Sequence, residues 1–119
     1  MSHSSQSKKF IIIYITYPNL KEAKRVTGIL LKQRLIACAN YFFVESSYRW
    51  LATSLASDGG KGKVENAKEV VSILKTKKAN WEKVKKAVEA RHPYETPCIM
   101  KLEVESNEAF ADWIEKETK

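Results

Sequence analysis

The most unusual chemistry of this sequence lies in the stretch Arg91–Pro97, which holds an imidazole, a phenol, a carboxylate and two prolines. His92 is one of two histidines in the chain, and Pro93 and Pro97 are two of its three prolines. Proline cannot continue a helix and disfavours helix for the residue before it, so the backbone is stiffened at both ends of the stretch. Two interpretations follow from these residues alone: a rigid connector whose polar side chains bond the backbone nearby, or a ligand site.

The length and composition predict a single globular domain. The chain has 119 residues, of which 44% are hydrophobic, and no segment has the apolar length of a membrane span. Residues 1–9 are polar and rich in serine, and we expect them to form a disordered tail that is neither a signal peptide nor part of the fold. Two cysteines are too few for a disulfide framework or a structural zinc site, which favours reduced thiols and a cytoplasmic location.

The net charge of +7 is compatible with nucleic acid, an acidic membrane surface or an anionic ligand. The lysines are spread along the chain and alternate with acids in its second half, which is typical of solvated helix faces. We therefore expect neither nucleic acid nor membrane as a partner. No nucleophile–base pair, phosphate loop or carboxylate dyad is visible, so the sequence does not predict an enzyme.

The first half of the chain predicts a strand, a helix and a second strand. Residues 10–16 are apolar and β-branched on both alternating faces, as in a buried central strand. Asn19 is a good N-cap, Glu22 could complete a capping box, and apolar residues then repeat at helical spacing to about Arg34. A long strand follows from residue 35 or 36 to about Trp50.

The second half repeats the pattern in the order strand, helix, strand. Residues 51–61 are rich in Ala, Ser and Gly and predict a flexible loop. A strand follows over 69–77, then a helix capped by Asn80 that ends at His92, a strand over 99–104, and a short final helix from about residue 106. In the last strand, alternation predicts three side chains inside the core: Met100, Leu102 and Val104.

This element order predicts an α+β, ferredoxin-like βαββαβ fold in one domain over residues 10–117. The four-stranded antiparallel sheet should have the order 4-1-3-2, with both long helices on one face and a short C-terminal helix. The first two strands are apolar on both faces, so the uncovered face would expose an apolar patch in a monomer. The strand to Trp50 would also form a long edge. Both features predict a subunit partner.

The sequence resembles the CutA divalent-ion tolerance family in a series of segments that occur in the same order. They are Ala37–Asn40, Ser47–Trp50, Gly62–Glu65, Ile73–Thr76, Arg91–Pro97 and Trp113–Ile114. The resemblance covers nearly everything from residue 10 to 117, and it implies a compact, very stable homotrimer with a link to copper and other divalent cations. Residues 51–61 look like an insertion relative to the family, which usually has an acidic residue soon after the tryptophan. Here Leu51 follows Trp50.

Three side chains then become candidates for a metal site: Cys38, His92 and Glu95. A thiolate, an imidazole and a carboxylate together suit Cu(II), Zn(II) or Cu(I). Their spacing is not a closed ligand motif, so such a site would have to be assembled in three dimensions, for example between subunits. Against it, a cysteine in an apolar strand is most often an inert buried thiol, and the helix dipole before His92 favours an imidazolium, which competes with a metal.

Four more residues are candidates for a ligand cleft: Tyr48, Trp50, Lys75 and Tyr94. The aromatic ones would equally suit packing at an interface, and Lys75 could pair with Glu95 or bind an anion. We therefore expect a trimeric protein that binds divalent cations, copper in particular, and does not catalyse a reaction. The alternative is a trimeric sensor of a small molecule or anion, of the nitrogen-regulator type. RNA binding is the weakest hypothesis, because residues 69–77 lack the aromatic residues and the glycine of an RNP motif.

Overall fold

The computed structural model describes residues 6–50 and 63–119, and the tail at 1–5 and the expected loop at 51–61 lie outside this range. Its elements are β1 (Ser7–Tyr17), α1 (Leu20–Lys32), β2 (Cys38–Trp50), β3 (Lys63–Thr76), a single 3-10 turn (Lys78–Asn80), α2 (Trp81–Arg91), β4 (Ile99–Asn107) and α3 (Glu108–Glu117). This is the predicted βαββαβ order followed by a C-terminal helix.

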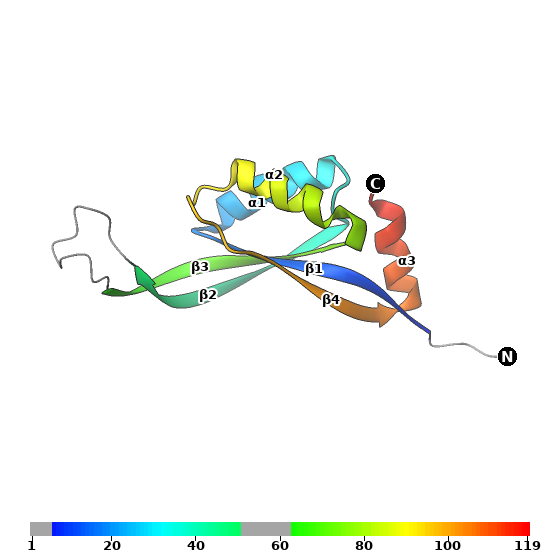
Figure 1. Cartoon of the computed structure of the whole chain (residues 1–119), viewed down its shortest axis with the longest axis horizontal. Coiled ribbons are helices and arrows are strands. Elements are labelled where there is room, and N and C mark those ends of the chain that lie inside the picture. The colour runs from blue at the N-terminus through cyan, green and yellow to red at the C-terminus, as the bar shows by residue number, and fades with distance from the viewer. Residues whose placement is uncertain (1–5, 51–62) are drawn as a thin grey trace.

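The four strands form one antiparallel sheet with the order β2-β3-β1-β4, which confirms the predicted arrangement. Helices α1 and α2 lie side by side on one face of this sheet, and α3 packs at one end of it (Figure 1). Strands β2 and β3 continue past the helices as a two-stranded arm. Within the described residues, β2 pairs with β3 alone, so it forms the long edge that the sequence predicted.

The core lies between the sheet and the two long helices. Alternate residues of β1 are fully buried there: Ile11, Ile13, Ile15 and Tyr17. They pack against buried apolar side chains of α1 (Val26, Leu30) and α2 (Val84, Val88). Because successive side chains of a strand point to opposite faces, the remaining residues of β1 point away from the helices. Residues directly opposite each other in neighbouring strands point to the same face of the sheet, so the register assigns a face to the residues of the adjoining strands as well. Ile13, for example, lies opposite Leu74 of β3 and Lys101 of β4.

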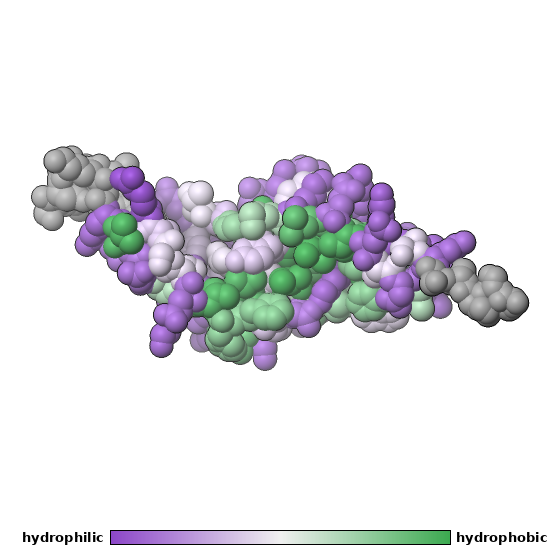
Figure 2. All heavy atoms as spheres, turned by 90° about the horizontal axis from the view of Figure 1, so that it is seen from below, coloured by the Kyte–Doolittle hydropathy of each residue, from purple (hydrophilic) through white to green (hydrophobic). Residues whose placement is uncertain are grey.

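The face away from the helices, here called the open face, is apolar and largely uncovered. Figure 2 shows hydrophobic residues gathered across the middle of this side. Phe42, Met100 and Leu102 are 50%, 48% and 54% exposed. The prediction that Met100 and Leu102 point into the core is therefore wrong: Ile99, next to them, packs on the core, so these two point to the open face. Of the three residues predicted to be inside, Val104 packs against the buried cluster of α3.

Two strands begin earlier than predicted. Ser7–Lys9 pair with Glu105–Asn107, so these residues belong to β1 and not to a disordered tail. Strand β3 starts at Lys63, six residues before the predicted start, and pairs with β2 along its whole length. The polar residues 63–68 have weak strand propensity by themselves, and pairing with the neighbouring strand overrides it.

The two predicted caps differ in their chemistry. The side chain of Asn19 accepts a hydrogen bond of 2.9 Å from the backbone N–H of Glu22, as expected of an N-cap. Glu22 does not close a capping box, because its carboxylate pairs with Arg25 at 2.8 Å. The side chain of Asn80 makes no cap bond to the described part of α2. Its buried amide instead donates to the carbonyl of Leu35 at 3.1 Å, joining the start of α2 to the segment before β2.

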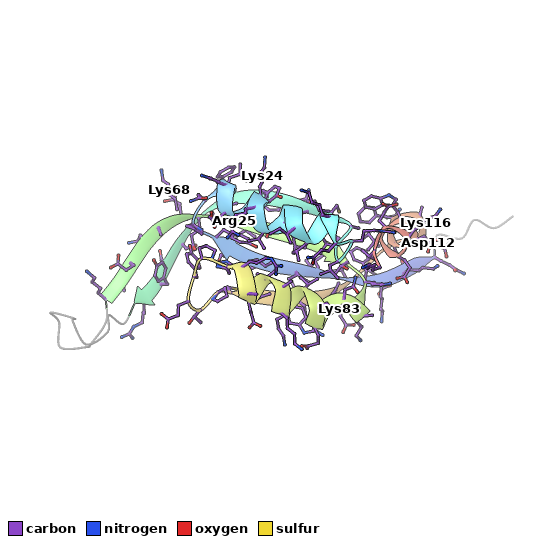
Figure 3. The ribbon with its side chains drawn as sticks, turned by 90° about the horizontal axis from the view of Figure 1, so that it is seen from above. Lys24, Arg25, Lys68, Lys83, Asp112 and Lys116 are labelled. Carbon is purple, nitrogen blue, oxygen red and sulfur yellow. The ribbon has the colours of Figure 1, made fainter. Side chains whose placement is uncertain are left out.

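The charged residues gather on the outside of the helix layer and at the margins of the molecule. Figure 3 shows Lys24 on α1, Lys68 on β3 and Lys83 on α2 in such positions, and all three are exposed. This arrangement agrees with the expectation that most lysines lie on solvated faces. In the part of the chain that the structure describes, no helix is long and apolar enough to cross a membrane.

Candidate functional site

The segment between α2 and β4 carries the imidazole, phenol and carboxylate that the sequence singled out. His92 follows the last residue of α2 as its C-cap, with the extended backbone angles φ −71° and ψ 140° expected for a residue before proline. Its backbone N–H still bonds to Val88 at 2.8 Å. The guanidinium of Arg25 on α1 donates to the carbonyl of Arg91 at 2.8 Å, which ties the end of α2 to its neighbour.

Both ring nitrogens of His92 are engaged within the chain. Nε2 lies 2.7 Å from the carbonyl oxygen of Thr16, and Nδ1 accepts from the backbone N–H of Tyr94 at 3.0 Å. A carbonyl can only accept and an N–H can only donate, so His92 is neutral with its proton on Nε2. Burial lowers the pKa of this imidazole, which outweighs the contact with Thr16 that would raise it. The expected preference for an imidazolium is therefore wrong.

Aromatic contacts hold the same segment against the sheet. The ring of His92 stacks on Tyr17 with centroids 4.6 Å apart and contacts Tyr94 at 4.9 Å. The phenol of Tyr94 donates a hydrogen bond of 2.6 Å to the carboxylate of Glu69 on β3. Burial and this bond raise the pKa of the Tyr94 phenol. His92 and Tyr94 thus act as the connector that one of the two interpretations expected.

An open cleft of about 930 Å³ lies on the open face, between the arm and this segment. Its walls come from β1, β2, β3 and the connection to β4: Thr16, Ser46, Tyr48, Glu65, Glu69, Pro93, Tyr94, Glu95, Thr96 and Cys98. Three of these side chains are carboxylates and none of these ten is Lys, Arg or His. Lys63 pairs with Glu65 at 3.5 Å, so the carboxylates of Glu69 and Glu95 give the cleft its excess of negative charge, in a chain with a net charge of +7.

The thiol of Cys98 adds a softer donor to this wall. Burial, followed by the charge of Glu69, raises its pKa, so the thiol is protonated at neutral pH in the isolated chain. A bound cation would favour the thiolate instead, because metal ligands must lose their protons. The lining therefore suits a cation and disfavours an anion.

The three predicted metal ligands do not meet within one chain. Cys38 lies opposite Lys75, in the row of Ile12, whereas the cleft begins in the row of Thr16. Four residues along a strand correspond to about 13 Å. His92 uses both ring nitrogens elsewhere, so only Glu95 of the set lines the cleft. Across residues 6–50 and 63–119, no three His, Cys, Asp or Glu side chains group closely enough to hold a metal ion.

Among the predicted cleft residues, Tyr48 and Tyr94 line the cleft and Lys75 does not. Trp50 ends β2, and its side chain lies outside the part of the chain that the structure describes. The sequence reasoning missed Glu65, Glu69 and Cys98. Glu65 and Glu69 could have been found from their even spacing on a strand, which places both on one face, but the predicted start of that strand excluded Glu65.

Comparison with known proteins gives this geometry its context. The family described as CutA1 divalent ion tolerance protein matches residues 11–117. A protein of Pyrococcus horikoshii named divalent-cation tolerance protein CutA is 40% identical over 110 residues, which cover 92% of this chain and 98% of that protein. A protein of the same name from Archaeoglobus fulgidus is 38% identical over 87% of this chain and 93% of its own length.

Solved structures of CutA proteins also align with most of this chain. The crystal structure of CutA1 from Pyrococcus horikoshii aligns with a TM-score of 0.80 at 39% identity, covering 92% of this chain and 98% of that one. A structure from Archaeoglobus fulgidus, described as a periplasmic divalent cation tolerance protein CutA, aligns at 0.81 with 34% identity over 94% of this chain and all of that one. The chain therefore belongs to the CutA1 divalent ion tolerance family.

Proposed function

We propose that the chain forms a homotrimer that binds divalent cations, copper among them, without catalysing a reaction. The observation that carries this proposal is the lining of the cleft, in which the described residues include three carboxylates, a thiol and no basic side chain. Relatives in two archaea are named divalent-cation tolerance proteins, which agrees with a cationic ligand. The alternative, a sensor of small anions, has no support in these comparisons, and the carboxylates of the cleft would repel such a ligand.

Copper is the expected cation because of the donor types. Carboxylate oxygens bind most divalent cations, while a thiol such as that of Cys98 favours softer ones. Cu(II) also binds more tightly to a given set of such donors than the other divalent metals of the first transition row. Since no complete ligand set forms within the described part of one chain, a neighbouring subunit is expected to close the site.

The trimer is proposed from the open face and from the edge of β2. Phe42, Met100 and Leu102 would not remain half exposed in a stable monomer without a function for that surface. The arm presents an unprotected strand edge beside the same surface. A second and third copy covering both would remove these two liabilities together. Light scattering at micromolar concentration should give three times the 13.6 kDa of one chain, and the mass of one chain would contradict the proposal.

The absence of catalysis is proposed from the states of the reactive groups. His92 has both ring nitrogens occupied, so neither is available to act as a general base. The thiol of Cys98 has a raised pKa, the opposite of an activated nucleophile.

Both cysteines are free, which supports a reducing, cytoplasmic setting for this chain.

The test of cation binding is a Cu(II) titration of protein that carries His3→Ala. This background removes the imidazole of His3, the other histidine of the chain, which could bind copper outside the cleft. Glu69→Gln and Glu95→Gln should each weaken binding about tenfold or more, because each replaces a charged carboxylate at the site with a neutral amide. Glu89→Gln is the matched control, since Glu89 is exposed on α2 and does not line the cleft. If His3→Ala alone abolishes binding, the cleft does not bind copper.

A further inference from the structure

One charged side chain on the open face stands apart from every described carboxylate. Lys75 on β3 is half buried and lies in the row of Ile12 and Cys38. Among the described residues, no carboxylate lies within ion-pairing distance of its ammonium group. A lysine in such surroundings is costly to cover with an apolar surface, because its charge would lose water and gain nothing.

Other charged side chains that the strands direct to the open face are satisfied within the chain. Lys8 pairs with Asp112 at 2.7 Å, Lys63 pairs with Glu65 at 3.5 Å, and Glu69 accepts from Tyr94 at 2.6 Å. The exception on the acidic side is Glu95. It is exposed, lines the cleft and has no ion pair in the described part of the chain.

Lys75 cannot reach the cleft of its own chain. Glu69 lies six residues away on the same strand, which is about 20 Å, and the row of Thr16 at the cleft is about 13 Å away. An extended lysine side chain spans only about 6 Å, given the usual lengths of its bonds. Within the described residues, an ammonium and a carboxylate without ion pairs thus stand on the same face, too far apart to meet within one chain.

We propose that Lys75 enters the cleft of a neighbouring subunit and pairs there with the partner subunit's Glu95. The proposal rests on the homotrimer proposed above. In a closed ring of three copies, each subunit gives its Lys75 to one neighbour and receives a lysine from the other, so three equivalent pairs form. The charge of every cleft is then partly neutralised, and the open face is covered without an unpaired ammonium.

The pair brings further predicted residues to one place. Cys38 lies directly opposite Lys75 in the β2–β3 ladder, so it approaches the partner's cleft together with the lysine. Cys38 and Glu95, which lie apart in a single chain, would then line one site formed by two subunits. An ammonium group and a divalent cation compete for the same carboxylate, so cation binding at Glu95 would displace Lys75.

A charge exchange tests the pair. Lys75→Glu and Glu95→Lys should each place like charges together at the subunit contact. Each should therefore raise the dissociation constant of the trimer at least tenfold. The constant is measured by light scattering over a series of guanidinium chloride concentrations. The double variant restores opposite charges and should recover most of this loss. Lys75→Glu combined with Glu89→Lys is the matched control, because it restores the net charge without placing a lysine in the cleft, and it should not recover.

A second measurement uses the unmodified protein, so it does not depend on the variants folding. Trimers reassembled from ¹⁴N- and ¹⁵N-labelled chains are treated with a carbodiimide, which joins only amines and carboxylates in direct contact. The expected product is a Lys75–Glu95 linked peptide that contains one label from each chain. A trimer in which Lys75 joins only other carboxylates, or in which the double variant is as weak as the single ones, would overturn the pair and leave the trimer standing. A monomeric protein would overturn both.

Discussion

Replacing His92 with alanine distinguishes a structural imidazole from a metal ligand. The ring contacts Tyr17 and Tyr94, and its two nitrogens bond to the carbonyl of Thr16 and the N–H of Tyr94. If these contacts are its purpose, His92→Ala should lower the free energy of unfolding and change copper affinity little. If His92 is a ligand, the opposite pattern is expected.

The size of the loss follows from the contacts. Each neutral hydrogen bond contributes about 1 kcal/mol net, and an aromatic stack such as that on Tyr17 contributes about 1 kcal/mol. His92→Ala, which removes two such hydrogen bonds and the stack, should therefore cost about 3 kcal/mol per chain. His92→Phe keeps a ring in place to stack on Tyr17 but loses both hydrogen bonds, so it should cost about 2 kcal/mol.

The assay is equilibrium unfolding in guanidinium chloride at one fixed protein concentration, because the stability of an oligomer depends on concentration. Copper affinity is measured in parallel in the His3→Ala background. The ordering wild type, His92→Phe, His92→Ala in decreasing stability, with copper affinity changed less than tenfold, is the expected result. Loss of copper binding with stability unchanged within about 0.5 kcal/mol would refute the reasoning.

Three further predictions concern stability. Folding lowers the pKa of His92, so the unfolded chain takes up a proton at a higher pH than the folded chain does. The free energy of unfolding should therefore fall as pH drops through the ordinary imidazole value of 6.5. His92→Phe should reduce this dependence on pH when unfolding is measured from pH 8 to 5. Arg34 has φ 58°, a region that glycine adopts at less cost, so Arg34→Gly should be about 1 kcal/mol more stable than Arg34→Ala in the same assay. Asn80→Ala removes the buried amide that donates to Leu35 and should cost about 1–3 kcal/mol, against less than about 0.5 kcal/mol for Glu89→Ala on the exposed face of α2.

The fold could be predicted because its signals are local and repeated. The buried residues of β1 alternate, those of α1 recur at helical spacing, and Asn19 caps the helix as its position indicates. The strand order and the apolar open face followed from these elements. The interior placement of Met100 and Leu102 failed because alternation shows which side chains share a face and not which face the helices cover.

The candidate site was only partly predictable, because its residues are joined by pairing and not by spacing. The motif around His92 and Glu95 was visible, but the hydrogen bonds that occupy both ring nitrogens depend on the placement of Thr16, near the end of β1, and of the backbone N–H of Tyr94. Cys38 was chosen as a ligand by chemical type alone. Its distance from the cleft follows from the β2–β3 register, which a single sequence does not reveal.

The register also determines the charge of the cleft. Glu65 and Glu69 face the cleft because Ile13 and Leu74 are paired in the buried core several residues away. A slip of β3 by one residue would turn both carboxylates to the other face and bring Lys68 to the cleft side instead. The slip is prevented by the core, since it would also expose Leu74 and bury Lys75. The hydrophobic pattern that stabilises the fold therefore also keeps the cleft acidic and holds Lys75 on the open face, where the proposed neighbouring subunit would meet it.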